Sequence, residues 1–384
     1  MKNYLLTPGP TPVLPEALQA MARPIIHHRT PQFQAILKEV EEHLKYVFQT
    51  KNDVLILAAS GTGAMEAAVT NLLSPGDRVV VVRAGKFGER WAELCASYGV
   101  EVIPIDVEWG KSVNPGAIKE ILKEDESRTT NHERRIKAVY TTLCETSTGT
   151  SADIEKIARI VKDYQAVLVV DAISALAAVP LKTDEWGVDV VVSGSQKGLM
   201  IPPGLAFISL SQKAWELAKS STLPKFYFNL SAYKKSIAKD DTPYTPAVNL
   251  IIGLNETLRA IKNEGLENVI ARHRKHAHAV RNAVTAMGLE LFAPDAYSDA
   301  VTAVNVPDGI DGGKLVKTMR DKYGVAIAGG QAELKGKIFR IATMGYITAP
   351  DLKVCIATLE TVLSETGYRF EKGAGVKALE DALE

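Results

Sequence analysis

The chain has 384 residues, of which 45 are lysine or arginine and 45 are aspartate or glutamate, so its formal net charge is zero. This balance excludes a global electrostatic attraction to nucleic acid or to an anionic membrane surface, and neither partner is expected. The 46% hydrophobic content is that of an ordinary globular protein, and the length predicts two or three folding units with a cleft between them.

The three cysteines, Cys95, Cys144 and Cys355, are far apart in the sequence and form no CxxC pair. This pattern argues against a disulfide framework and against a structural zinc site, and it fits a reducing cytoplasm. The apolar run before Pro8 is too short for a signal peptide, and no later run approaches the length of a membrane span. We therefore expect a mature, soluble, cytoplasmic protein.

From Val54 to Ser209 short apolar runs alternate with amphipathic stretches. Apolar runs with little alternation are typical of strands that are covered on both faces, and the helical patterns between them predict parallel crossovers. The sequence therefore predicts a large α/β domain around a mostly parallel seven-stranded sheet. The expected strands begin near Val54, Arg78, Val100, Ile136, Ala166, Val188 and Gly204.

The pattern changes beyond these strands. Between about Leu230 and Leu250 the alternation fails, and residues 233–249 are polar and contain prolines, which predicts an irregular loop. One long helical pattern follows from Leu250 to about Met287, then strand candidates start at Ala300 and Lys337, and a last helical pattern covers residues 350–365. Helices and strands in separate runs predict a smaller C-terminal α+β domain.

The first feature with chemical meaning is Ser60-Gly61-Thr62-Gly63, which follows the first strand, with a helical pattern opening at Ala64. Glycines let backbone N–H groups approach a phosphate, the threonine hydroxyl adds a donor, and a helix N-terminus carries partial positive charge. The motif fits a phosphate cup and, equally well, a plain strand-to-helix turn. It lacks the lysine of a P-loop and the third glycine of a dinucleotide fingerprint, which disfavours ATP and NAD.

Two more features end apolar strands. Asp171 would point into the crevice where α/β proteins bind ligands, although a helix N-cap explains it as well. Lys197 follows the strand at Val188, where a desolvated ammonium is costly unless it is paired or converted into a Schiff base; alone, it would be a surface lysine in a Gly-Ser loop. Together the three features match the phosphate anchor, the pyridinium partner and the Schiff-base lysine that pyridoxal phosphate requires.

With these motifs the sequence resembles the class V aminotransferases of fold type I, in particular the alanine–glyoxylate and serine–pyruvate aminotransferases. The resemblance covers nearly the whole chain, in the order TPGPTP, YVFQTKN, SGTG, ETSTG, VDAISAL, SGSQKG followed by PPG, and GKIFRIATMG. It implies the α/β fold of these enzymes, a large domain with a seven-stranded sheet and a smaller C-terminal α+β domain. The expected division is an N-terminal arm over residues 1–20, a large domain over residues 21–253 and a small domain over residues 254–384.

The resemblance also implies roles for single residues. Lys197 would hold pyridoxal phosphate covalently and then move a proton between the substrate Cα and the cofactor, while Asp171 would keep the pyridine nitrogen protonated. Phe87 would stack on the ring, where relatives often carry Trp, and Arg340 would bind the substrate α-carboxylate. The other implied cofactor-binding residues are Thr62, Gly63, Ala64, Thr146, Ile173, Gln196 and Thr245, and Gly9 would contact the substrate.

Thr245 matches a residue that reaches the phosphate of the neighbouring subunit, so the resemblance implies a homodimer with shared active sites. Relatives carry a phosphate-binding Tyr three positions earlier, where this chain has Thr242. Tyr244 is near but out of register. His28 and Arg29 resemble a part that closes over the substrate, and the roles of all three side chains stay open.

The same family contains lyases and cysteine desulfurases. Desulfurases place His directly before the Schiff-base lysine and need a nucleophilic Cys on a mobile loop, whereas this chain has Gln196 there and carries Cys355 in an apolar helical pattern that predicts a core position. A non-catalytic accessory subunit of a redox complex is a further alternative. The sequence has no cysteine cluster for iron–sulfur binding to support it.

A histidine cluster, His273, His276 and His278, lies among basic residues without an adjacent carboxylate. This favours a solvated basic face over a metal site, and no metal is expected. The expected function is a pyridoxal phosphate-dependent transaminase. It would move an amino group from alanine or serine to glyoxylate or pyruvate in a ping-pong cycle.

Overall fold

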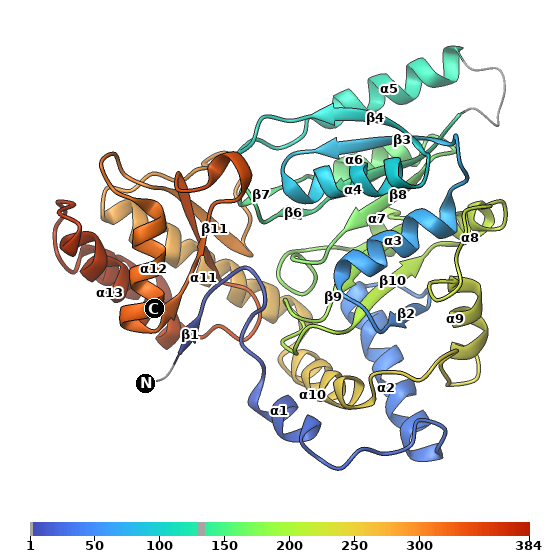
Figure 1. Ribbon diagram of the computed structural model, residues 1–384, viewed down its shortest axis with the longest axis horizontal. Helices are drawn as coiled ribbons and strands as arrows, with labels where there is room; N and C mark the ends of the chain where they lie inside the picture. The colour runs from blue at the N-terminus through green and yellow to red at the C-terminus, as the bar shows by residue number, and fades with distance from the viewer. Residues whose placement is uncertain (1–2, 129–134) are drawn as a thin grey trace.

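The large sheet forms the centre of the computed structural model, which describes residues 3–128 and 135–384 (Figure 1). Within these residues the sheet has seven strands in the order β2-β10-β9-β8-β5-β3-β4. Strand β10 is antiparallel to both of its neighbours, and the other pairs are parallel. The predicted mostly parallel seven-stranded sheet is therefore confirmed. Its strands are β2 (Val54–Leu57), β3 (Arg78–Arg83), β4 (Glu101–Asp106), β5 (Ile136–Thr142), β8 (Val167–Asp171), β9 (Val190–Gly194) and β10 (Ala206–Leu210).

Both faces of this sheet are covered, which explains the continuous apolar runs. In β3, Val80 and Val82 belong to one buried cluster, whereas Val79 and Val81 belong to another. Successive side chains of a strand point to opposite faces, so each cluster lies on its own side of the sheet. Around the sheet lie α1 (Pro15–Met21), α2 (Pro31–Phe48), α3 (Gly61–Leu72), α4 (Lys86–Ser97), α5 (Pro115–Arg128), α6 (Ile154–Val161), α7 (Thr183–Trp186), α8 (Gln212–Ala218), α9 (Leu230–Ile237) and α10 (Val248–Glu264).

Local capping explains where several helices begin. Thr30 caps α2 by accepting a hydrogen bond from the Phe33 N–H, and Pro31 follows at the first helical position. Asn229 caps α9 in the same way. The prediction of an irregular loop over residues 233–249 is therefore wrong for residues 233–237, which lie in α9, and for residues 248–249, which begin α10; the stretch between the two helices is irregular.

A second, smaller sheet lies beside the large one (Figure 1). In the described residues its strand order is β11-β14-β13. The N-terminal strand β1 (Tyr4–Leu5) pairs in parallel with β12 (Val325–Ala326), so the start of the chain is attached near the small sheet. The other elements here are β11 (Val301–Asn305), β13 (Ala328–Gly329), β14 (Ile338–Ala342), α11 (Leu266–Ala286), α12 (Gly312–Tyr323), the 3-10 helix η2 (Ala332–Leu334), α13 (Ala349–Glu365) and α14 (Ala374–Leu383).

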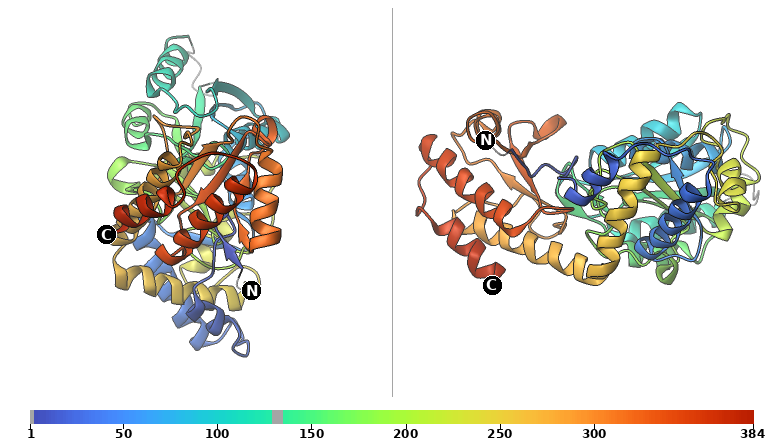
Figure 2. Two further views of the ribbon diagram at one scale, coloured as in Figure 1. Left: turned by 90° about the vertical axis from the view of Figure 1, so that its left-hand side faces the viewer. Right: turned by 90° about the horizontal axis from the view of Figure 1, so that it is seen from below.

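The single helix predicted from Leu250 to Met287 is in fact two. Gly265, with a φ of 87°, separates α10 from α11, because this left-handed backbone conformation ends a helix. Figure 2 shows that α11 runs from α10 toward the small sheet. The predicted boundary between residues 253 and 254 lies inside α10, and the division into three parts stays a prediction.

Cys95, Cys144 and Cys355 are buried free thiols. Burial raises the pKa of each thiol to about 12, since an apolar environment disfavours the thiolate. The predicted core position of Cys355, in α13, is confirmed. In residues 3–128 and 135–384, no helix is both long and apolar enough to span a bilayer.

Candidate active site

Three predicted features meet at one edge of the large sheet. Strand β10 is antiparallel to both β2 and β9, so β2 runs in the same direction as β9, and β8 is parallel to β9. The C-terminal ends of β2, β8 and β9 therefore lie at the same edge. The Ser60–Gly63 motif follows β2, Asp171 ends β8 and Lys197 follows β9.

Lys197 is buried, with 8% of its surface exposed. Desolvation lowers the pKa of its ammonium to about 8, because burial disfavours the charged form. Its Nζ donates a hydrogen bond to the Pro8 carbonyl, so the N-terminal arm lies directly on the lysine. At Gly9 a Cβ atom would be 2.3 Å from Lys197 Nζ, and with a φ of 122° only glycine fits there.

Asp171 is 3% exposed, and one of its carboxylate oxygens accepts a hydrogen bond from the Ile173 N–H at 2.8 Å. Desolvation raises the pKa of this carboxyl to about 7. A cation held against it would lower the pKa again, because an opposite charge favours the ionised form. The carboxylate is therefore suited to a cationic partner within the site.

The phosphate-cup motif lies against these residues. Helix α3 begins at Gly61, three residues before the predicted start at the fully buried Ala64, and the Ser60 side chain makes no capping hydrogen bond. The N–H groups of this first turn therefore lack a capping side chain. At Gly61 a Cβ atom would be 2.5 Å from the Ile173 Cδ1 atom, so a side chain there would disturb the packing around the cup.

Gln196 precedes the lysine and contributes an amide to the same place. Within the described residues its Oε1 atom is buried and has no hydrogen-bond partner. A Cβ atom placed at Gly194 would be 3.1 Å from this oxygen and 3.5 Å from the backbone of Gly61. The Gln196 amide therefore lies close to the start of α3. Rotation of the amide exchanges its oxygen and its NH2 group, so the side chain can present N–H donors to an anion.

Phe87 lies in the first turn of α4, and a buried carboxylate holds that turn. Glu145, which is 2% exposed, accepts hydrogen bonds from the N–H groups of Phe87 and Gly88, both at 3.0 Å, and from the Ser147 N–H at 3.2 Å. Desolvation raises the pKa of Glu145. Glu145 lies in the ETSTG motif but is not among the residues predicted for the site.

Arg340 comes from the small sheet, where it occupies the centre of β14. It is 4% exposed, and desolvation lowers the pKa of its guanidinium to about 10. Nη1 donates to the Thr146 carbonyl at 2.7 Å, while Nε and Nη2 donate to the Gly329 carbonyl at 3.0 and 2.6 Å. Three of five N–H groups are thus used, and the side chain joins the small sheet to the turn between β6 (Cys144–Glu145) and β7 (Thr150–Ser151).

Thr245 and Tyr244, in the stretch between α9 and α10, lie outside this buried group. Thr245 is exposed. The Tyr244 ring stacks on Tyr227, with centroids 5.1 Å apart, and its hydroxyl donates to the Phe226 carbonyl at 3.0 Å. Arg29 forms an ion pair with Asp241 of the same segment.

The histidine cluster differs from the prediction of a solvated face. His273 and His276 are buried and only His278 is exposed, because α11 packs its histidine-bearing face against neighbouring loops. The ring nitrogens of His273 are 3.1 and 3.2 Å from the carbonyl oxygens of Ala177 and Gly345. Desolvation lowers the pKa of His273 to about 3 and that of His276 to about 4. Among the described residues no group of three His, Cys, Asp or Glu side chains could hold a metal ion.

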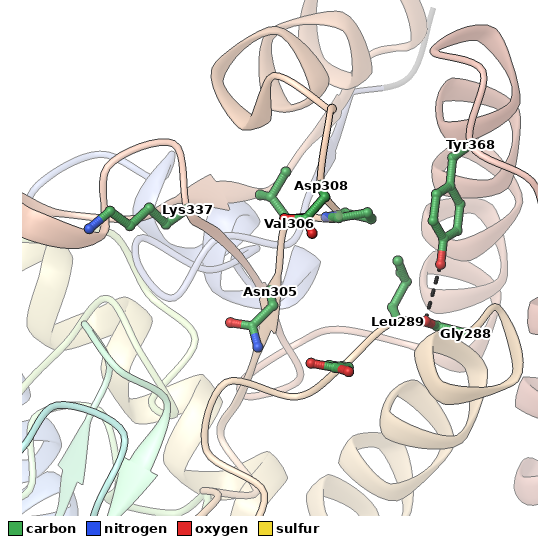
Figure 3. A pocket seen from close by; sticks show the side chains of 9 residues that line it. Gly288, Leu289, Asn305, Val306, Asp308, Lys337 and Tyr368 are labelled. Atoms are coloured by element: carbon green, nitrogen blue, oxygen red, sulfur yellow. Dashed lines mark hydrogen bonds between the residues drawn. The ribbon is translucent and has the colours of Figure 1, made fainter.

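A separate cavity of about 390 Å³ lies beside the small sheet (Figure 3). Its side chains carry both signs of charge, and Tyr368 donates a hydrogen bond to the Gly288 carbonyl at 3.1 Å across its rim. None of the predicted site residues lines it. The lining consists of Gly288, Leu289, Glu290, Asn305, Val306, Pro307, Asp308, Lys337 and Tyr368.

Comparison with known proteins places these observations in a family. The family model described as "Aminotransferase class-V" matches residues 3–349. The chain is 47% identical over 380 residues to the "Soluble hydrogenase 42 kDa subunit" of Anabaena cylindrica, covering 98% of this chain and 97% of the relative.

Two further relatives carry aminotransferase names. The L-aspartate–glyoxylate aminotransferase of Paracoccus denitrificans is 39% identical over 385 residues, covering 99% of this chain and 96% of the relative. The serine–glyoxylate aminotransferase of Methylorubrum extorquens is 37% identical over 392 residues, covering 100% and 96%. Among solved structures, an alanine–glyoxylate aminotransferase from Nostoc sp. matches with a TM-score of 0.89 and 31% identity, covering 94% of this chain and 96% of that one.

Proposed function

The chain belongs to the class V aminotransferase family and is a pyridoxal phosphate-dependent transaminase of fold type I, and from this premise we propose which substrates it uses and which residues act. The proposed reaction moves the amino group of a small amino acid, alanine or serine, to a small 2-oxo acid, glyoxylate or pyruvate. The observation that supports it most directly is the single buried group of Lys197, Asp171 and Arg340 beside an uncapped helix start.

The residues present fit pyridoxal phosphate. We assign the phosphate to the cup formed by Thr62, Gly63 and the start of α3, with the Gln196 amide beside it, and the ring to the space between Phe87 and Ile173. The glycine contacts at Gly61 and the unpartnered Gln196 Oε1 atom support this placement. Asp171 would face the pyridine nitrogen, and Thr146 would lie near the ring.

Pyridoxal phosphate supplies, when bound, an electron sink for the charge that develops at the substrate Cα atom. Lys197 is the group that holds the cofactor and moves the proton at Cα, because a pKa of about 8 makes its amine an effective base near neutral pH. Asp171 would hold the proton on the pyridine nitrogen. The N-terminal arm, with Gly9 against Lys197, would limit access of water to the lysine.

Arg340 would orient the substrate by its α-carboxylate. Its contacts with Thr146 and Gly329 fix the guanidinium plane and leave two N–H groups for a substrate oxygen. The acceptor named for the three aminotransferase relatives is glyoxylate in each case, whereas their donors are aspartate, serine and alanine. We assign alanine or serine to this chain, since one carboxylate-binding arginine suffices for a small donor.

The proposed assembly is a homodimer with shared active sites. Phe226 is 81% exposed beside Tyr227 and Tyr244, which leaves an aromatic surface next to the exposed Thr245. A second copy seated on this surface would bury the aromatic rings and bring Thr245 to the phosphate of the neighbouring site. The proposed location remains the cytoplasm, where the buried thiols of the three cysteines stay reduced.

The alternatives fit less well. A desulfurase needs an accessible thiolate, whereas burial keeps all three thiols protonated at neutral pH. The hydrogenase name of the Anabaena relative belongs to that protein and assigns no role in a redox complex to this chain. In this chain Lys197, Asp171 and Arg340 are gathered in one buried site, which a non-catalytic subunit does not need.

The test is a half-reaction screen. Purified protein loaded with pyridoxal phosphate is mixed with single amino acids, and loss of the visible absorption band is followed together with release of the 2-oxo acid. Serine or alanine is expected to discharge the band, and glyoxylate or pyruvate to restore it. Protein that stays colourless after addition of the cofactor, or that responds to no amino acid, would contradict the proposal.

A further inference from the structure

Arg90, which is not among the predicted site residues, contacts Thr62 of the proposed phosphate cup and Phe87 of the proposed ring site. It lies on α4, one turn after Phe87. Its Nη1 atom donates a hydrogen bond to Thr62 Oγ1 at 3.3 Å, and its guanidinium carbon is 4.9 Å from the centre of the Phe87 ring. Its charge also reaches the two titratable groups of the site: it opposes the desolvation that raises the pKa of Asp171 and adds to the desolvation that lowers the pKa of Lys197.

The arginine lacks an acidic partner. Over residues 3–128 and 135–384 no carboxylate lies in ion-pair contact with Arg90. Of the neighbouring acids, Glu89 pairs with Lys86 and Glu66 accepts a hydrogen bond from the Tyr98 hydroxyl. Glu93, one turn further along α4, is not in ion-pair contact with Arg90 either. A partly buried guanidinium without a counter-ion, directed at a helix start that no side chain caps, is an arrangement suited to an anion.

The hydrogen bond to Thr62 has a directional consequence. A threonine hydroxyl has one proton to donate and can accept through its lone pairs. Because Thr62 Oγ1 accepts from Arg90, its proton is free to point toward another acceptor. A phosphate oxygen in the cup would then meet the Thr62 O–H and the N–H groups of α3, with the guanidinium charge beside them.

We propose that Arg90 is a phosphate-binding residue of this site, which orients the Thr62 hydroxyl and supplies positive charge to the cofactor phosphate. The inference rests on the proposed phosphate cup and adds to it the charged group that the glycine motif lacks. Contact with the Phe87 ring holds the guanidinium in place, because cations are attracted to aromatic faces. The phosphate and the ring of the cofactor would thus be held by one helix.

The experiment compares two ligands that differ only in the phosphate. Apoprotein is titrated with pyridoxal phosphate and with pyridoxal, and binding is read from the absorption of the Lys197-bound ligand. The variants are Arg90→Gln, Arg90→Lys and, as a matched control, Arg159→Gln, which removes an exposed arginine that pairs with Glu155 on α6. Arg90→Gln is expected to weaken pyridoxal phosphate roughly 10- to 100-fold while changing pyridoxal by less than about twofold.

Arg90→Lys should retain part of the affinity for pyridoxal phosphate, and Arg159→Gln should match the unmodified protein. A second readout without cofactor is the thermal midpoint of the apoprotein, which inorganic phosphate should raise in the unmodified protein and raise less in Arg90→Gln. This comparison stays informative if the variant is less stable, because each protein is its own reference.

Three outcomes would overturn the inference. Equal weakening of both ligands would mean that Arg90 acts through packing on Phe87. If Arg90→Gln bound pyridoxal phosphate with unchanged affinity and lost activity only toward a dicarboxylic donor such as aspartate, Arg90 would be a substrate-binding residue. If the unmodified protein bound neither ligand, the proposed function itself would fail together with the inference.

Discussion

Replacement of Glu145 should release the start of α4 from the active site. In Glu145→Ala the buried N–H groups of Phe87, Gly88 and Ser147 all lose their acceptor. Each unsatisfied buried donor costs roughly 1–3 kcal/mol, and since water can enter the space left by the side chain, we take the lower end and expect a loss of about 3 kcal/mol locally. In Glu145→Gln one oxygen remains, so the loss should be about half as large.

Hydrogen exchange measures this effect directly. Because 1.4 kcal/mol corresponds to a tenfold change, peptides that cover residues 86–97 should exchange roughly 100-fold faster in the Glu145→Ala apoprotein. The matched control is Glu155→Gln, which removes an exposed carboxylate that pairs with Arg159 and should leave exchange unchanged. Unchanged protection of the α4 peptides in a folded Glu145→Ala protein would refute the idea that this carboxylate holds the helix.

Three further predictions concern charged side chains. Lys197→Ala should abolish turnover and the visible absorption band. In the unmodified apoprotein the rate of cofactor binding to Lys197 should rise with pH up to about 8 and then level off, because only the neutral amine attacks the cofactor. A rate that does not change with pH would contradict this prediction. Arg340→Lys should lower kcat/KM for α-amino acids roughly 10- to 100-fold but spare an alkylamine donor that has no carboxylate, and an equal loss for both would contradict its role. The pKa of His273 is lowered to about 3 and that of His276 to about 4, so the neutral forms of both stabilise the fold above pH 6.5, and stability should fall as the pH drops from 6.5 to 3. His273 accounts for up to roughly 5 kcal/mol of this loss, so His273→Asn should reduce the pH dependence without abolishing it, whereas His278→Asn, on the exposed side of the same helix, should leave it unchanged.

The sheet and the ends of its strands were predictable because their signals are local. An apolar run bounded by turn residues needs no knowledge of its neighbours, so all seven strands of the large sheet were found. The positions of Asp171 and Lys197 followed, since the residue after a buried parallel strand must emerge at the ligand edge. The break at Gly265 carried a local signal too, a glycine after Asn-Glu in a helical pattern, and it was missed because the apolar period continues on both sides.

The remaining errors concern contacts between distant segments. Nothing near His273 in the sequence shows that α11 packs it against the carbonyl groups of Ala177 and Gly345. The contacts of Glu145 and Arg90 are likewise long-range. Glu145 meets α4 only because the β6–β7 turn packs against that helix, and Arg90 meets Thr62 only because α3 lies beside α4. Polar side chains in such patterns fit a solvated surface equally well, and only the packed structure shows which of them are buried.

A protein with a net charge of zero can bind an anionic cofactor because most of its charges are paired on the surface, whereas the cations of the site are buried. On the surface, lysines and acids pair at short sequence distances, as Lys156 does with Asp153 and Lys219 with Glu216. In the site, Lys197 and Arg340 lie in a desolvated place where their charged forms are disfavoured, as their lowered pKa values show. A bound dianion would reverse this cost, because an opposite charge in a low-dielectric site stabilises each cation more strongly than water-exposed acids can. Local burial, and not the overall charge, therefore decides where this protein binds an anion.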